Sequence, residues 1–186
     1  MPKRNILGAA LLSLGLAVSA QARLTVKAIA AGDRQSLALA SDGTVWEWPI
    51  WEFKPYRAAK SLVPVQVAGL SDIVAIAEGG GHSLALKRDG TVWAWGDNNY
   101  GQLGDGTKTD RSTPVQVSGL TDVTAIAAGW DHTIALRNDG TVWAWGRNDQ
   151  GQLGDQTTFN QSTPVKVFGL SNVTAISAGD QHSMAL

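Results

Sequence analysis

Cysteine is absent from the 186-residue chain, so disulfide bonds cannot stabilise the fold and side-chain packing must do so instead. An excess of positive charge is also missing, because 15 Lys and Arg stand against 16 Asp and Glu. The basic surface that would bind a phosphate backbone is therefore not expected, and we predict no nucleic-acid partner. Beyond the first 22 residues, no apolar run is long enough to span a bilayer.

The N-terminal segment differs in character from the rest of the chain. Lys3 and Arg4 form a basic start, residues 6–18 are apolar or small, and Ala20-Gln21-Ala22 has the small-x-small form of a cleavage site. This order is typical of a bacterial secretory signal peptide. We predict that residues 1–22 are removed and that residues 23–186 form an exported protein, periplasmic or extracellular, without a membrane anchor.

The most informative feature of the sequence is an internal repeat with a period of about fifty residues. Histidine recurs at this spacing, at His82, His132 and His182. Two later segments recur as well: Gly-Thr-Val-Trp-Ala-Trp-Gly at 90–96 and 140–146, and Gly-Gln-Leu-Gly-Asp at 101–105 and 151–155. Segments of the form Pro-Val-x-Val then begin at Pro64, Pro114 and Pro164. The pattern predicts a tandem array of similar units.

Each unit contains four short segments with the composition of β-strands. In the third unit they are residues 123–127, 133–137, 141–145 and 164–167, which are rich in β-branched and aromatic side chains. Asp-Gly pairs separate the second and third segments, at 42–43, 89–90 and 139–140, where a tight hairpin requires positive φ. No segment after residue 22 has the length and period of an amphipathic helix.

Four short strands in each repeat predict an all-β fold, a β-propeller built from blades of four antiparallel strands. The segment Ala-Ile-Ala-Ala-Gly is expected to form the innermost strand, because blades narrow toward the propeller axis and leave room only for small side chains. Alternation along Thr-Val-Trp-Ala-Trp places both tryptophans on one face of the strand. We expect them to fill the space between neighbouring blades.

These motifs carry a family resemblance. Gly-His-Ser-Leu-Ala-Leu (81–86), Asp-Gly-Thr-Val-Trp-Ala-Trp-Gly (89–96), Gly-Gln-Leu-Gly-Asp and Pro-Val-x-Val closely resemble the regulator of chromosome condensation repeat. The resemblance covers about residues 28–186 and implies a seven-bladed propeller. Residues 23–186 hold about three and a quarter units, at about 28–74, 75–124, 125–174 and 175–186, so we expect a truncated sequence. A partial ring would leave open blade edges through which copies could self-associate.

The first unit departs from the pattern. Gln35 occupies the histidine position, and residues 49–60 replace the Gly-Gln-Leu-Gly loop. We interpret this unit as a cap, since terminal repeats of an array lack one neighbour. Trp51, Phe53 and Tyr56 in the divergent loop are candidates for an exposed apolar patch, with a buried cap as the alternative.

The recurring histidines are the first candidates for chemistry, because histidine is the usual acid–base residue and metal ligand. Equivalent positions of a seven-bladed ring lie too far apart to share one metal ion, so we expect each histidine to hydrogen-bond the turn of its own blade. No nucleophile, carboxylate pair or metal-ligand spacing stands outside the repeat. The sequence therefore predicts a protein without catalytic residues, metal or cofactor.

Function is expected where the copies differ. Variable loop residues on a constant scaffold are a common source of binding specificity. The candidate protein-binding residues are Trp130, Asp131, Tyr100, Arg147 and Phe159. We predict an exported protein-binding module. The family resemblance implies two alternatives, a guanine-nucleotide exchange factor and a secreted inhibitor of the β-lactamase-inhibitor type.

Overall fold

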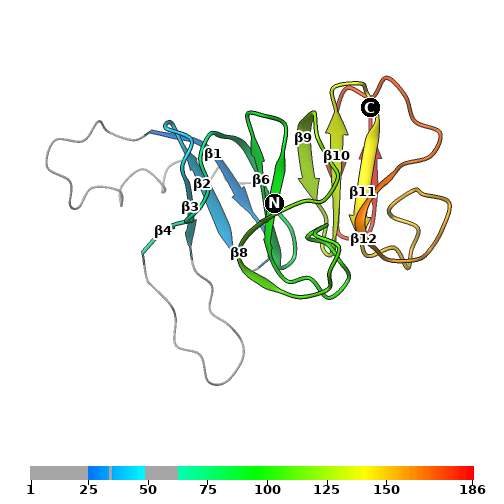
Figure 1. The fold of residues 1–186 in the computed structure, drawn as a ribbon, viewed down its shortest axis with the longest axis horizontal. Coiled ribbons are helices and arrows are strands. Elements are labelled where there is room, and N and C mark those ends of the chain that lie inside the picture. Colours follow the sequence, from blue (N-terminus) through cyan, green and yellow to red (C-terminus); the bar gives the residue numbers. More distant parts are fainter. Residues whose placement is uncertain (1–24, 34, 49–62) are drawn as a thin grey trace, which may run out of the picture.

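The computed structural model describes residues 25–33, 35–48 and 63–186. These residues form fourteen β-strands and no helix, arranged as three four-stranded antiparallel sheets and one two-stranded sheet. Each four-stranded sheet takes its strands in chain order from one edge to the other. The sheets follow one another in sequence order across the molecule (Figure 1). The predicted all-β array of four-stranded propeller blades is confirmed.

Each sheet is one blade. Blade 1 contains β1 (Val26–Ala31), β2 (Ser36–Ala40), β3 (Val45–Trp48) and β4 (Val65–Gln66). Blade 2 contains β5 (Ile73–Glu78), β6 (His82–Lys87), β7 (Val92–Gly96) and β8 (Arg111–Gln116). Blade 3 contains β9 (Val123–Ala128), β10 (His132–Arg137), β11 (Val142–Gly146) and β12 (Gln161–Lys166). The fourth sheet pairs β13 (Ile176–Ala178) with β14 (Ser183–Ala185).

The first strand of each sheet is the innermost one. β1, β5, β9 and β13 lie against one another in succession, while the later strands of each blade diverge. Alanine is the commonest residue of these strands, and its small side chain lets neighbouring blades converge. The structure confirms that the small-residue segment takes the inner position.

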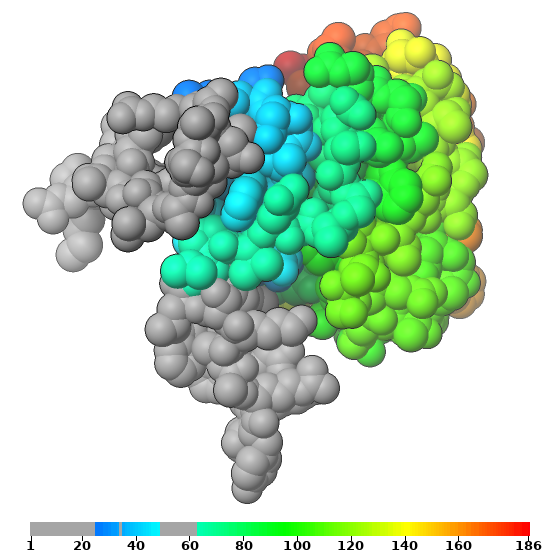
Figure 2. Space-filling model, turned by 60° about the vertical axis from the view of Figure 1, so that its left-hand side comes forward, coloured from blue at the N-terminus to red at the C-terminus, as the bar shows by residue number. Residues whose placement is uncertain are grey.

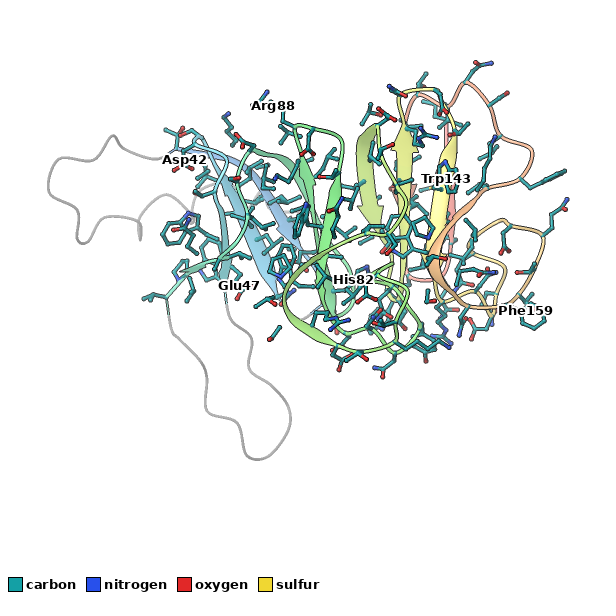
Figure 3. All side chains as sticks on the ribbon, viewed as in Figure 1. Asp42, Glu47, His82, Arg88, Trp143 and Phe159 are labelled. Atoms are coloured by element: carbon teal, nitrogen blue, oxygen red, sulfur yellow. The ribbon has the colours of Figure 1, made fainter. Side chains whose placement is uncertain are left out.

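The predicted hairpins are present. Gly43, Gly90 and Gly140 have φ values of 82°, 81° and 73°, and in each turn the preceding aspartate accepts hydrogen bonds from the following threonine. These turns lie at one end of the blades, the turn end, together with the connections between blades. The opposite end, the loop end, carries the connections from first to second and from third to fourth strands. Figure 3 shows Asp42 and Arg88 at the turn end, with His82 and Phe159 toward the loop end.

The fourth strand is longer than predicted. The sequence predicts a strand at residues 164–167, whereas β12 spans Gln161–Lys166 and contains Pro164. Proline has no N–H to donate, but the outermost strand of a blade pairs on one side only, so a proline there removes no ladder hydrogen bond. The same holds for Pro114 in β8.

Tryptophans join the blades as expected. Trp95 of blade 2 packs with Leu37, Leu39 and Val45 of blade 1, and Trp145 of blade 3 packs with blade-2 residues such as Leu103. Trp145 is fully buried. Figure 2 shows blades 1 and 2 in close contact side by side. The core of the molecule therefore consists of successive layers between blades.

Trp145→Ala is expected to lower the free energy of unfolding by about 3–5 kcal/mol, because it empties a fully buried site between two blades. Trp143 points to the same blade interface but is only half-buried. Trp143→Ala is therefore the matched control, and it should cost less than half as much. Urea unfolding followed by circular dichroism measures both; equal losses would contradict the layered core.

Candidate functional site

Beneath the surface of the loop end, a group of buried hydrogen bonds connects neighbouring blades. We call this group a joint. The backbone oxygen of Gln102 in blade 2 accepts from the Thr133 hydroxyl and from the Trp145 indole N–H of blade 3, both at 2.9 Å. Nε2 of His82 lies 2.9 Å from the same Thr133 hydroxyl. The single hydroxyl proton is already donated to Gln102, so Nε2 must carry the proton of the imidazole and donate it to Thr133. The joint fixes blade 3 on blade 2.

The same joint recurs one blade further along. Nε2 of His132 lies 3.0 Å from the Ser183 hydroxyl, which donates to the backbone oxygen of Gln152 at 2.8 Å. Burial lowers the pKa of His82 to about 3 and that of His132 to about 4, each helped by the next histidine. Both imidazoles are therefore neutral near pH 7.

The histidine side chains bond different partners from those expected. The prediction that each histidine side chain bonds the turn of its own blade is wrong for His82 and His132, because their partners lie on the following blade. The turn is already satisfied by the backbone, with the Gly79 N–H donating to the His82 carbonyl at 2.8 Å and the equivalent Gly129 bond at 2.8 Å. The ring rests against Gly79, where a Cβ would lie 2.4 Å from Cε1. The glycine leaves room for the ring to reach across the interface.

Two buried asparagines shape the long loops. Asn98 and Asn148 are fully buried, and each side chain bonds three or more groups of its own loop. The Asn98 Oδ1 accepts from the Leu103 N–H at 3.0 Å, which places Leu103 in the blade interface. The loops are therefore fixed parts of the scaffold, and their exposed side chains are held in place.

Three of the predicted binding residues come together on this surface. The Arg147 guanidinium lies 5.1 Å from the ring centre of Tyr100, which belongs to the neighbouring blade. Its nitrogens lie 3.5 Å from Asp131 and 2.6 Å from Asp149. Hydrogen bonding to Arg147 lowers the pKa of Asp149. We call Tyr100, Asp131, Arg147 and Asp149 the arginine cluster.

Asp149 was not among the predicted residues. Its position two residues after Arg147, in a loop that varies between copies, was the signal that could have identified it.

Trp130 borders a shallow hollow beside the arginine cluster. The hollow has a volume of about 230 Å³ and is lined by residues that follow the inner strands: Gly32, Asp33, Gly79, Gly80, Gly129, Trp130 and Asp180. The loops around it are tied together, since the Gly80 N–H donates to the Trp130 carbonyl and the Trp130 N–H donates to that of Asp180. The indole lies over Gly80, where a Cβ would approach Cδ1 to 2.9 Å. Trp130 is 40% exposed.

Phe159 lies apart from this group. It is 74% exposed in the long loop of blade 3, at the loop end (Figure 3). Its backbone oxygen accepts a hydrogen bond from the Asn148 side-chain amide at 3.1 Å. Trp51, Phe53 and Tyr56 lie outside the described residues. Within the described part of the chain, no group of three or more His, Asp or Glu is arranged to hold a metal ion.

The described residues contain no helix long and apolar enough to cross a lipid bilayer. Their sheets, tied by repeated joints, define the class as a β-propeller of four-stranded blades. A family model described as the RCC1-like domain matches residues 12–186. The chain therefore belongs to the RCC1-like family.

Solved structures agree with this assignment. Human WBSCR16 is 26% identical with a TM-score of 0.75, over 88% of this chain and 44% of that protein. Prp20p from Saccharomyces cerevisiae is 25% identical with a TM-score of 0.74, over 91% of this chain and 44% of that protein. Yeast RCC1 (Prp20) bound to Kap60 is 24% identical with a TM-score of 0.74. The chain spans less than half the length of these proteins, and a comparison with curated proteins gives no match.

Replacing His82 tests the joint. His82→Leu removes the bond to Thr133 and is expected to lower the free energy of unfolding by about 1–3 kcal/mol. His82→Gln should cost less, because Gln35 fills the same position in blade 1 and donates to Ser83 of the following blade. Equal losses in the two variants, measured by urea unfolding, would show that the hydrogen bond does not contribute.

The histidine joint also predicts a pH dependence. The folded pKa of His82 lies below the usual value of 6.5, so its stabilisation is present above pH 6.5 and is lost as the pH falls toward 3. From pH 7 to pH 5 the wild type should lose about 1–2 kcal/mol relative to His82→Gln. If the free energy of unfolding changed with pH in the same way in the two proteins, as measured by urea unfolding, this account would be contradicted.

Proposed function

We propose that this protein is an interaction module whose loop end binds another protein. The observation that carries the proposal is the arginine cluster, which groups non-repeating side chains from two blades on a surface fixed by the joints below it. Tyrosine, arginine and tryptophan are the residue types most enriched at the energetic centres of protein interfaces. Trp130 borders the hollow and directly precedes Asp131 of the cluster in sequence, so it extends this surface.

The charge of the loop end indicates the kind of partner. Among the described residues, its connections carry eight aspartates against two basic residues, and the adjoining strand ends add Glu78 and Arg111. The connection residues are Asp33, Asp97, Asp105, Asp110, Asp131, Asp149, Asp155 and Asp180 against Lys108 and Arg147. The turn end and its adjoining strand residues carry five of each sign: Asp42, Asp72, Asp89, Asp122 and Asp139 against Lys27, Lys87, Arg88, Arg137 and Lys166. The described part of the loop end is therefore acidic, which favours a partner with a basic patch and speeds their encounter at low salt.

The chain as a whole has no excess of basic residues, with 15 Lys and Arg against 16 Asp and Glu, which disfavours nucleic acid as the partner. We further propose that the protein acts outside the cytoplasm, on the basis of the signal-peptide pattern of residues 1–22. N-terminal sequencing of protein recovered from the periplasm or medium tests this, and an intact Met1 would contradict it.

No catalytic role is proposed. The His82 and His132 side chains are neutral parts of the joints, and the carboxylates of the arginine cluster are held by Arg147. A guanine-nucleotide exchange activity is the second candidate, because the similar Prp20p structure was described with its binding to Gsp1p and histones. Exchange of labelled GDP on small GTPases tests it directly, and acceleration by catalytic amounts of this protein would favour it over simple binding.

The interaction surface is tested with two matched arginines. Arg147→Ala is expected to weaken partner binding by about tenfold or more, because it removes the centre of the cluster. Arg137→Ala is the control: Arg137 has nearly the same exposure, 26% against 27%, and also pairs with two aspartates, but it lies at the turn end. Binding is measured by affinity capture from periplasm or medium, followed by titration of the captured protein.

Loss of binding in both variants, or in neither, would contradict a site at the loop end. Trp130→Ala gives an independent measurement, since Trp130 lies on the hollow and takes no part in the ion pairs of Arg147.

A further inference from the structure

The joint between blades 1 and 2 differs in chemistry from the joints that follow. In the later joints the hydroxyl of Thr133 or Ser183 donates to a backbone oxygen of the preceding blade's Gly-Gln-Leu-Gly loop. Blade 1 has no Gly-Gln-Leu-Gly sequence, because residues 49–60 replace it. The equivalent donors of blade 2, the Ser83 hydroxyl and the Trp95 indole N–H, bond two carboxylates instead.

Glu78 and Glu47 supply these carboxylates. Ser83 donates to Glu78 Oε1 at 2.9 Å, and Trp95 Nε1 donates to Glu47 Oε2 at 3.3 Å. The side-chain amide of Gln35, at the histidine position of blade 1, donates to Glu78 Oε2 at 3.2 Å and also to Ser83. Both glutamates break the repeat, since the later units have alanine at these positions.

We propose that this carboxylate joint makes the attachment of blade 1 dependent on pH, so that blade 1 is held most firmly when Glu78 is protonated and opens more readily as Glu78 ionises. The geometry gives the reason. Glu78 lies between two blades, and among the described residues the groups that bond or act electrostatically on its carboxyl are the neutral Gln35 and Ser83 and the acidic Glu47. No cation among them balances a negative charge, so ionisation leaves a charge in the interface that opening would hydrate.

The direction follows from linkage. Burial raises the pKa of Glu78 from 4.5 to about 8, against the hydrogen bonds from Ser83 and Gln35, and the charge of Glu47 adds to the rise. A raised folded pKa means that the stabilisation is complete below pH 4.5 and is lost as the pH rises through about 8. The histidine joints have the opposite sign, because their stabilisation is complete above pH 6.5 and is lost toward pH 3–4. One array thus contains two kinds of joint that respond oppositely to pH.

Hydrogen exchange measured by mass spectrometry on the whole protein tests this, with rates divided by the intrinsic amide rates at each pH. From pH 5 to pH 8, opening of β1–β3 is expected to rise by about tenfold or more. Opening of β9–β11 should stay level or fall over the same range. If opening of blade 1 and opening of blade 3 changed with the same sign and size in the wild type, the proposal would be overturned.

Two variants separate titration from packing. Glu78→Gln keeps an oxygen acceptor for Ser83 but cannot ionise, so blade 1 should lose its pH dependence. Glu47→Gln keeps the acceptor for Trp95 but removes the nearby charge that raises the pKa of Glu78. The rise in opening of blade 1 with pH should therefore be smaller in this variant, with less opening than in the wild type at each pH above about 6. If Glu78→Gln fails to fold, the Glu47→Gln shift and the wild-type comparison of blades still decide the question. An unchanged pH dependence in Glu78→Gln would refute the assignment.

Discussion

The structure depends on one recurring contact, the hydrogen-bonded joint by which each blade accepts side chains of the next. In the joint of blades 2 and 3, a single backbone oxygen of Gln102 receives the Thr133 hydroxyl and the Trp145 indole, and His82 closes the group from the side. These polar atoms are buried, so leaving any of them unpaired would cost more than the bond itself contributes. The blades are therefore held in register by directional bonds, while Trp95 and Trp145 pack into the apolar layers between them.

The joint explains the arrangement of the loop end. The blade-2 loop that provides the Gln102 oxygen also carries Tyr100. Blade 3, which donates hydrogen bonds to this oxygen, carries Asp131 and Arg147. Fixing the buried part of this loop fixes its exposed part, so side chains from two blades meet without a flexible segment between them. Such preorganisation lowers the entropic cost of binding. The buried residues of these loops thus form the constant scaffold, and their exposed neighbours in sequence form the variable surface.

The first blade shows that the joint can be rebuilt with different groups. Where the Gly-Gln-Leu-Gly sequence is absent, Glu47 and Glu78 supply the acceptors and Gln35 replaces histidine. Together these three residues satisfy the donors of blade 2, the Ser83 hydroxyl and the Trp95 indole N–H, and join Gln35 to them. The same change replaces a neutral group with an ionisable one, which gives this interface a different response to pH. Unit 1 thus lacks the Gly-Gln-Leu-Gly acceptor, and glutamate side chains take its place. This compensation is a second feature of the unit beside its terminal position in the array.

The sequence by itself determined the repeat, the strands, the Asp-Gly turns, the inner position of the alanine-rich strand and the packing of tryptophan between blades. Each of these is set by local pattern, by residue size or by backbone conformation, and a fifty-residue period shows them several times over. Only the tertiary structure decided which groups bond across the interfaces. The Thr133 partner of His82, the Gln35 partner of Ser83 and the Glu47 partner of Trp95 lie about fifty residues away in sequence, on a neighbouring blade, and no local pattern identifies them. For the same reason the sequence selected Tyr100, Asp131 and Arg147 singly, whereas the packing of blade on blade brought them together.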